Sequence, residues 1–233
     1  KTRMGAEWVR AQAESNRRLK VALVGATQAD ARRVMIEGES GLLAIAPPRW
    51  RPRWEPSLGR LTWPNGAQAH VYSAAEPDSL RGPEHGIAWA DEIGKWAEGE
   101  AAWSNLELTM RAGRKPRIMA TTTPRPVPLI RRLLAQRDVA VTHGRSAANR
   151  AHLAEGFLDA VTAIYGGTRL GRQELDGELV DDVAGALWTR DLIERCRAGV
   201  APGLDRVVIG VDPPPGTAGD ACGIVAVGLA PAA

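Results

Sequence analysis

Short apolar runs alternate along the first half of the chain with amphipathic segments, and this alternation predicts an α/β fold. Strands are predicted where such runs stop abruptly, at Lys20–Val24, Gly86–Ala90 and Arg117–Thr121. Near-continuous apolar runs are typical of strands that are buried on both faces of a parallel sheet. Because right-handed crossovers connect such strands through helices, we expect the three strands to be parallel neighbours in a three-layer fold.

Apolar residues at helical spacing predict the helices between these strands. Met4, Trp8 and Ala11 share one side of a helix that begins at the Lys1-Thr2 pair. Four further segments are predicted as helices on the same grounds: Gln28–Glu37, Ala101–Met110, Val127–Gln136 and Glu155–Tyr165.

Other strand patterns lie outside the parallel set. Arg60–Trp63 and Ala67–Ser73 alternate on either side of Asn65-Gly66, a dipeptide typical of β-hairpin turns. A short strand is also predicted at Val139–His143.

Composition adds that the chain is an ordinary soluble globular protein. Its 233 residues are 44% hydrophobic and 24% charged, which suffices for one large domain or slightly more. No apolar run approaches the roughly 20 residues of a membrane span, and the charged N-terminus lacks the apolar core of a signal peptide. Cys196 and Cys222 are too few for a disulfide framework or a zinc site, which favours a reducing compartment. The net charge of +3 permits phosphate contacts without requiring them.

Two adjacent carboxylates, Asp91 and Glu92, end the strand predicted at Gly86–Ala90. Ligands of α/β proteins bind beyond the carboxyl ends of parallel strands, where these acids would lie. In nucleoside triphosphatases the first such acid holds Mg²⁺ and the second polarises the water that attacks the γ-phosphate. The alternative is a strand that ends in a solvated acidic turn.

The first two residues suggest what the acids would face. Lys1-Thr2 at a helix start matches the end of a P-loop, G-x-x-x-x-G-K-[ST], in which the lysine reaches the phosphates and the hydroxyl binds Mg²⁺. The neighbouring strand ends in three hydroxyl residues, Thr121, Thr122 and Thr123, which could sense a γ-phosphate. The alternative is a run of residues with high β-propensity that is stopped by a proline. The chain has no initiator Met and opens within this pattern, so we expect it to be a fragment.

Three charged residues elsewhere have both a functional and a structural interpretation. Arg81 could stabilise charge on a transferring phosphoryl group or be an ordinary loop residue. In the tail, Val207–Asp212 and Gly223–Leu229 are predicted strands, with Asp220 between them. A strand-tip Asp212 suits a two-metal nuclease sheet, whereas a plain hairpin with a solvated aspartate is the alternative.

The order of these motifs resembles the large terminase subunit of tailed bacteriophages and gene-transfer agents, the ATPase-nuclease that packages DNA. Lys-Thr is followed by Ser-Leu-Arg-Gly-Pro, Ala-Trp-Ala-Asp-Glu and Thr-Thr-Thr-Pro, then by Gly-Arg-Gln-Glu-Leu-Asp-Gly-Glu and Val-Asp-Pro. The resemblance spans nearly the whole chain, and its most specific parts are Arg81–Glu92, Thr121–Pro124 and Arg172–Glu178 with Ala186-Leu187-Trp188.

The resemblance implies a role for each of these positions. Lys1 and Thr2 match the end of Walker A, Asp91 the Walker B Mg²⁺ acid, and Glu92 the catalytic carboxylate. Further matched positions are the coupling motif at Thr121–Thr123, an arginine acting across a ring interface at Arg81, the first nuclease metal acid at Asp212, and an auxiliary acid at Asp220.

The resemblance also implies a domain order. Residues 1–125 would be a P-loop ATPase core of the ASCE type without its first strand and glycine-rich loop. Residues 126–197 would be a lid subdomain with linker, and residues 198–233 the start of a ribonuclease H-like nuclease domain. Because the glycine-rich loop and the remaining nuclease acids are missing, we expect this fragment to be inactive by itself.

The implied cofactors are ATP with Mg²⁺, and Mg²⁺ or Mn²⁺ for the nuclease. The implied partners are double-stranded DNA, the portal protein, the small terminase subunit and further copies in a ring, in the cytoplasm of a bacterial host without membrane contact. Two other interpretations stay open: another P-loop helicase or translocase ATPase, and a non-catalytic prophage remnant that binds DNA or a partner.

Overall fold

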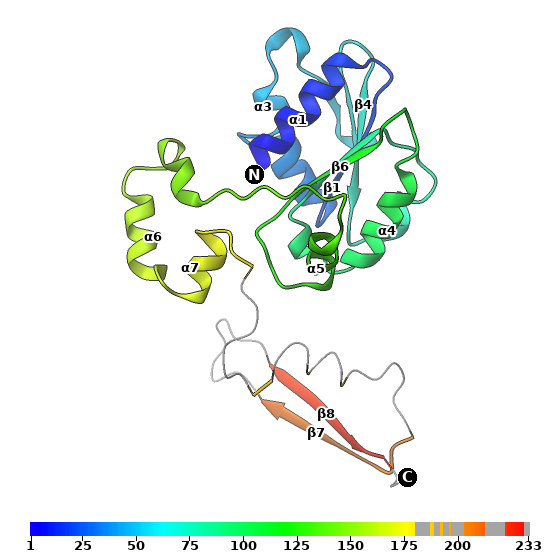
Figure 1. Cartoon of the computed structure of the whole chain (residues 1–233). Coiled ribbons are helices and arrows are strands. Elements are labelled where there is room, and N and C mark those ends of the chain that lie inside the picture. Colours follow the sequence, from blue (N-terminus) through cyan, green and yellow to red (C-terminus); the bar gives the residue numbers. More distant parts are fainter. Residues whose placement is uncertain (180–186, 189–191, 193–195, 197–202, 213–221, 231–233) are drawn as a thin grey trace. The chain divides into compact units, whose positions relative to one another are not determined.

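A six-stranded sheet lies at the centre of the first part of the chain (Figure 1). Its strands are β1 (Lys20–Gly25), β2 (Arg53–Glu55), β3 (Arg60–Thr62), β4 (Gln68–Ser73), β5 (Ile87–Asp91) and β6 (Arg117–Thr121). They are arranged in the order β2-β3-β4-β1-β5-β6. β1 pairs in parallel with both β4 and β5, and β5 pairs in parallel with β6. The three predicted strands are therefore confirmed as parallel neighbours.

The computed structural model describes residues 1–179, 187–188, 192, 196, 203–212 and 222–230. The chain forms two compact units, Lys1–Asp181 and Asp182–Ala233. None of the described helices has the length and apolarity needed to cross a membrane.

Helices cover both faces of the sheet. The α-helices of the first unit are α1 (Thr2–Ser15), α2 (Gln28–Asp30), α3 (Leu42–Ile45), α4 (Gly99–Thr109), α5 (Pro128–Ala135), α6 (Phe157–Tyr165) and α7 (Arg169–Glu174). Short turns of other helix types are η1 (Ala31–Ile36), η2 (Pro48–Trp50), η3 (Pro56–Leu58), η4 (Pro77–Leu80), η5 (Ile93–Lys95) and η6 (Ser146–His152). α1 and α3 lie on one side of the sheet and α4 and α5 on the other (Figure 1).

Alternation along the strands divides the core into two layers. In β1, Val21 and Leu23 pack into the cluster under α1, whereas Ala22 and Val24 pack into the cluster under α4 and α5. Successive strand residues point to opposite faces, so one apolar run supplies both layers. This arrangement confirms the predicted three-layer α/β architecture.

The predicted hairpin at Asn65-Gly66 is confirmed, since β3 and β4 pair antiparallel around it. The helix predicted over Gln28–Glu37 is present in two parts. α2 is capped by the Thr27 hydroxyl, which accepts a hydrogen bond from the Asp30 N–H at 3.1 Å. It continues as the wider π-helix η1, closed by a bond from the Glu37 N–H to the Arg32 carbonyl at 3.0 Å.

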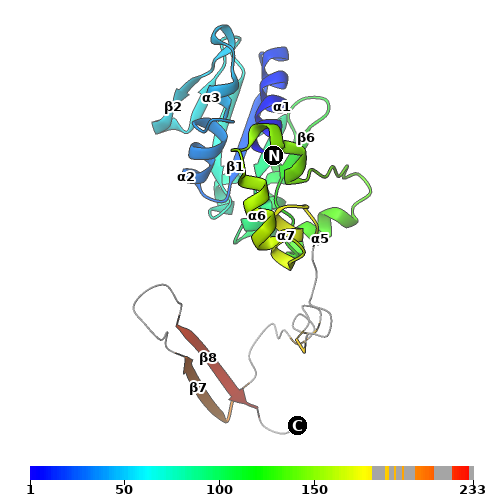
Figure 2. The same cartoon turned by 90° about the vertical axis from the view of Figure 1, so that its left-hand side faces the viewer.

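The strand predicted at Val139–His143 is wrong. These residues form no strand, and Val139 and Val141 are exposed. A strand needs a neighbour to pair its backbone groups, and no described strand pairs with this segment. Beyond it, α6 and α7 pack against each other as a helix pair (Figure 2).

The second unit contains two antiparallel strands, β7 (Arg206–Asp212) and β8 (Gly223–Leu229). Both predicted tail strands are therefore confirmed. Asp212, the last residue of β7, pairs with Gly223, the first residue of β8.

Candidate active site

The carboxyl ends of β5 and β6 bring the predicted acids and hydroxyls together. Asp91 and Thr121 are register partners at the last position of the two parallel strands. The Thr121 hydroxyl donates a hydrogen bond to Asp91 Oδ1 at 2.5 Å, and both side chains are buried. The strand pairing itself therefore fixes the distance between these two groups.

Glu92 turns the chain away from the sheet in a strained conformation. Its backbone is left-handed, with φ of 51° and ψ of 47°, and it is the only described non-glycine residue with positive φ. This region is disfavoured for residues with a Cβ atom, and such strain is concentrated at functional sites. The turn directs the carboxylate towards the start of α1.

Lys1 forms an ion pair with the Glu92 carboxylate. Its ammonium lies 2.7 Å from Glu92 Oε1 and donates a hydrogen bond to the Thr123 hydroxyl at 2.5 Å. Lys95 lies 3.8 Å from the second oxygen of Glu92. The start of α1 and the ends of β5 and β6 therefore meet at one edge of the sheet.

Thr122 joins the two loops that follow β5 and β6. Its hydroxyl accepts a hydrogen bond from the Gly94 N–H at 3.0 Å and donates one to the Thr123 carbonyl at 2.8 Å. A Cβ atom on Gly94 would lie 2.9 Å from this hydroxyl, so the approach requires glycine. The middle threonine therefore fixes the loops rather than facing Lys1.

Burial and neighbouring charges separate the two carboxylates electrostatically. Burial raises the pKa of Asp91, the nearby Glu92 raises it further, and the hydrogen bond from Thr121 only partly opposes this. Burial would also raise the pKa of Glu92, but the hydrogen bond and charge of Lys1 outweigh it and hold that pKa below its usual value. Glu92 is thus a stable anion, whereas Asp91 is a buried carboxyl whose ionised form a cation would favour.

The donor chemistry at this edge fits Mg²⁺. Among the described residues no three His, Cys, Asp or Glu side chains form a metal cage. Mg²⁺ needs only one or two carboxylates when phosphates and water complete its shell. Asp91 would supply a carboxylate, and Thr2, the first residue of α1, would supply a hydroxyl.

A family comparison identifies the chain. Residues 1–195 match the family described as terminase large subunit, T4likevirus-type, N-terminal. The chain belongs to this large terminase family. No curated protein sequence matches it.

Solved structures of large terminases have the same fold. The large terminase from a thermophilic bacteriophage superposes with a TM-score of 0.64 at 13% identity, over 97% of this chain and 56% of that one. The complex of that terminase with ADP gives 0.63 at 14% identity, over 91% and 53%. The ATPase domain of the Thermus phage P74-26 large terminase gives 0.52 at 16% identity, over 77% and 84%. The fold is that of large terminase ATPase domains, of the P-loop ASCE type, and the chain spans about half the length of the first of these terminases.

Arg81 does not join the groups at the carboxyl ends of β5 and β6. It follows η4, its side chain is 69% exposed, and its guanidinium pairs with Asp78 Oδ1 at 3.1 Å. η4 is held against α4, where the Asn105 amide donates to the Pro77 carbonyl at 2.9 Å. No interaction that the structure gives Arg81 involves Lys1 or the acids.

The predicted nuclease acids form no second site among the described residues. Asp212 is exposed at the end of β7, and among the described residues it belongs to no group of three or more His, Cys, Asp or Glu side chains that could hold a metal. Asp220 lies outside the described residues. The ribonuclease H-like domain therefore stays a prediction from the resemblance.

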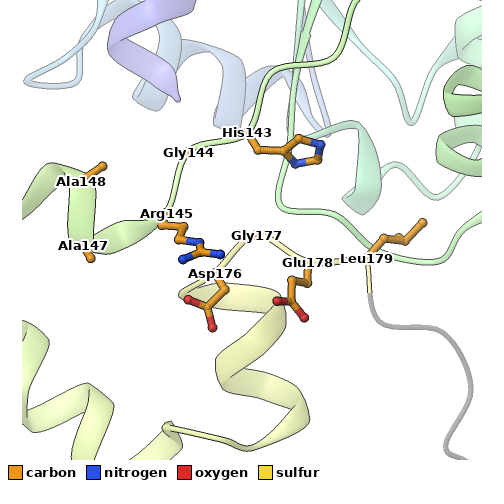
Figure 3. A pocket seen from close by; sticks show the side chains of 9 residues that line it. All are labelled: His143, Gly144, Arg145, Ala147, Ala148, Asp176, Gly177, Glu178 and Leu179. Atoms are coloured by element: carbon orange, nitrogen blue, oxygen red, sulfur yellow. The ribbon is translucent and has the colours of Figure 1, made fainter.

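The first unit also contains an open hollow of about 710 Å³ (Figure 3). It is formed by residues 143–148 on one side and residues 176–179 on the other. The Ser146 N–H holds the two segments together by donating to the Leu175 carbonyl at 2.8 Å. None of the predicted site residues lines this hollow.

Two tryptophans that contact the Asp91–Thr121 pair could not be recognised as site residues from the hydrophobic pattern. Trp89 resembles any core residue of a buried strand, yet its indole N–H donates to the Thr121 hydroxyl at 3.0 Å. Trp96 likewise donates to the Asp91 carbonyl at 3.0 Å. Both tryptophans are close in sequence to the acid pair, but an apolar pattern records burial and not hydrogen bonding.

Proposed function

We propose that this chain belongs to the ATP-hydrolysing part of a large terminase subunit. That subunit drives double-stranded DNA into a viral prohead and couples this movement to DNA cleavage. The observation that carries the proposal is the cluster of Lys1, Glu92 and Thr123 beside the Asp91–Thr121 pair, in a chain of this family. The family match supports a terminase over a general helicase. Solved structures of the thermophilic-phage terminase contain ADP or ATP-γ-S, which supports a nucleotide as ligand of this fold.

The proposed roles follow from charge and position. Lys1 binds the phosphates at the start of α1, where a lysine and free backbone N–H groups favour anions. Thr2 and Asp91 hold Mg²⁺, which neutralises phosphate charge when it is bound. Glu92 accepts a hydrogen bond from the attacking water and orients it with its carboxylate, which pairs with Lys1 before the nucleotide binds.

Lys1 also links the nucleotide to the coupling motif Thr121–Thr123. Its ammonium contacts both Glu92 and Thr123, so a γ-phosphate that attracts Lys1 competes with these two partners. Release of Glu92 and Thr123 would then accompany nucleotide binding. This exchange is how we propose that hydrolysis is transmitted to the segment after β6, the predicted lid of residues 126–197.

Further parts of the proposal concern partners and the tail. Arg81 acts on the nucleotide of a neighbouring copy in a homo-oligomeric ring, for which its exposed side chain is suited. The ring works with the portal protein and the small terminase subunit in the cytoplasm of a bacterial host. Residues 198–233 begin a nuclease domain in which Asp212 and Asp220 bind Mg²⁺ or Mn²⁺.

The test is Mg²⁺-dependent ATP hydrolysis by the full-length protein, measured with and without double-stranded DNA. We expect turnover that needs Mg²⁺ and rises with DNA. Residues 1–233 alone, measured in parallel, should lack turnover. Full-length protein that binds no nucleotide would contradict the proposal.

A further inference from the structure

Three buried polar groups form a row beneath the edge of the sheet. Trp89 in β5 is fully buried, Thr121 in β6 is 3% exposed, and Asp91 is 6% exposed. The Trp89 indole Nε1 lies 3.0 Å from the Thr121 hydroxyl oxygen, which lies 2.5 Å from Asp91 Oδ1. The row therefore runs from the core to the carboxylate proposed to hold Mg²⁺.

The direction of these hydrogen bonds is determined by chemistry. An indole N–H can only donate, so the Thr121 oxygen accepts from Trp89. The hydroxyl hydrogen of Thr121 then has two acceptors within reach, Asp91 Oδ1 at 2.5 Å and the Ala90 carbonyl at 3.5 Å. The shorter, charge-assisted bond to Asp91 is the stronger.

The same indole supports α1. An ideal Cβ atom built on Gly5 would overlap the Trp89 ring, so the ring is in direct contact with the helix backbone. Gly5 lies one turn after Lys1, and its N–H donates to the Lys1 carbonyl at 3.2 Å. Trp89 thus contacts both the helix that begins at Lys1 and the hydroxyl that holds Asp91.

We propose that Trp89 is a positioning residue for the magnesium carboxylate. Its N–H orients the Thr121 hydroxyl, which fixes Asp91 Oδ1 and leaves the second carboxylate oxygen directed to the cation. The inference rests on the proposed function, because it concerns the Mg²⁺ that accompanies the nucleotide. Partners that orient a metal ligand typically change metal affinity roughly 10–100-fold when removed.

The decisive variant is Trp89→Phe in the full-length protein, which keeps an aromatic ring and removes the N–H donor. Binding of a fluorescent ATP analogue is titrated with Mg²⁺ and compared with binding in EDTA. We expect the Mg²⁺ concentration for half-maximal tightening to rise roughly 10-fold, with affinity in EDTA unchanged. Thr121→Val should produce the same shift, and the double variant should add little to it.

The matched control is Trp63→Phe. Trp63 belongs to the same core cluster and is 2% exposed, but among the described residues its indole N–H has no hydrogen-bond partner. The same loss of volume there should leave the Mg²⁺ titration unchanged. Thr121→Ser, which keeps the hydroxyl, should restore wild-type behaviour.

Two outcomes would overturn the inference. One is a wild-type Mg²⁺ titration for Trp89→Phe while Thr121→Val is shifted, which would leave the indole a packing role only. The other is equal weakening in Mg²⁺ and EDTA, which would indicate a general defect of the fold. Wild-type protein without Mg²⁺-dependent nucleotide binding would instead refute the proposed function, and this inference with it.

Discussion

Two of the strands that the structure describes end in an aspartate, and these two ends differ in almost every other respect. Asp91 at the end of β5 is 6% exposed and accepts a hydrogen bond from Thr121 on the next strand. Asp212 at the end of β7 is exposed, and its register partner is Gly223, which has no side chain to offer.

The difference follows from strand direction. Parallel strands end at the same edge, so β5 and β6 deliver an acid and a hydroxyl to one place. In the antiparallel pair, the end of β7 meets the beginning of β8. The side chains on both faces of β7 are also exposed, as Val208 at 54% and Ile209 at 63% show. Among the described residues, the acid at the end of β5 therefore gains a partner from a neighbouring strand end and layers that exclude water, whereas the acid at the end of β7 gains neither.

The largest effect should come from Glu92→Gln. The amide keeps the size of the side chain but loses the negative charge that orients water, so ATP turnover should fall roughly 10²–10⁴-fold. Nucleotide affinity should be retained. Steady-state hydrolysis and equilibrium binding of the full-length protein measure the two quantities separately.

The control for this variant is Glu98→Gln, because Glu98 is an exposed carboxylate only a few residues further on. Its turnover should equal that of the wild type. A near wild-type rate of ATP hydrolysis by Glu92→Gln would contradict the proposed role of the carboxylate at the end of β5.

At the other strand tip, Asp212→Ala should abolish metal-dependent DNA cleavage by the full-length protein and leave ATP hydrolysis intact. Two metal ions roughly 3.5–4 Å apart need a carboxylate fixed on a strand. Plasmid cleavage in Mg²⁺ or Mn²⁺ is the measurement, with Asp205→Ala just before β7 as control. Residues 1–233 alone should not cleave DNA, because a lone Asp212, even with Asp220, cannot hold both ions.

Persistent cleavage by Asp212→Ala would move the nuclease site elsewhere in the full-length protein. Cleavage by residues 1–233 alone would mean that this part of the chain already holds a complete metal site, which contradicts the prediction.

A third polar cluster, just before β5, extends the comparison to pH. His85 is 1% exposed and hydrogen-bonds the hydroxyls of Tyr72 at 3.1 Å and Thr109 at 3.0 Å. The Thr109 hydroxyl donates to the Leu106 carbonyl at 2.8 Å, so it accepts from His85 Nδ1. In the neutral imidazole, Nε2 then accepts from the Tyr72 hydroxyl.

Burial, with the charges of His70 and Lys20, lowers the pKa of His85 from 6.5 to about 4. The unfolded chain therefore binds a proton between these values that the folded chain rejects. The contribution of His85 to the free energy of unfolding should be fully present above pH 6.5. The free energy of unfolding should then fall by roughly 3 kcal/mol as the pH drops towards 4. Urea unfolding at several pH values should show this slope, and His85→Gln should flatten it.

Exposed His152 provides the control, since His152→Gln should leave the pH slope unchanged. A wild-type slope in His85→Gln would assign the acid sensitivity to other groups.

The smallest expected effect is on stability, and it compares a glycine packed against β5 with a glycine in β7. Gly5→Ala would place a Cβ atom in overlap with the Trp89 ring and should cost roughly 1–3 kcal/mol of stability. Gly210→Ala in β7 is the matched change, because the nearest atom there lies 3.9 Å away. The melting temperature should be lowered by the first change and unaffected by the second. Equal melting temperatures would mean that α1 can move off the indole freely.

Much of the fold could be predicted from the hydrophobic pattern of the sequence. The apolar runs of β1, β5 and β6 identified the buried strands, and parallel pairing then placed Lys1 near Glu92. The segment Val139–His143 has the same apolar character but no partner strand among the described residues, and pairing depends on residues far away in sequence.

The site was less predictable below the level of its charged groups. Nothing in the letters distinguishes Trp89, which donates to Thr121, from Trp63, which fills space. The division of labour among the three threonines also depended on geometry, since Thr121 contacts Asp91, Thr122 the Gly94 N–H and Thr123 Lys1.

The left-handed backbone of Glu92 lowers the stability of the fold at the position that the proposed ATP hydrolysis requires. A left-handed conformation favours glycine, and relieving such strain typically gains roughly 1 kcal/mol. Glu92→Gly would therefore relax the turn after β5 while deleting the carboxylate that Lys1 contacts. Random mutagenesis screened for heat resistance alone should drift towards glycine at this position and away from hydrolysis. Purifying selection on ATP turnover would keep a glutamate at a position whose backbone favours glycine. The residue at the position that corresponds to 92 therefore indicates whether a homologue still hydrolyses ATP.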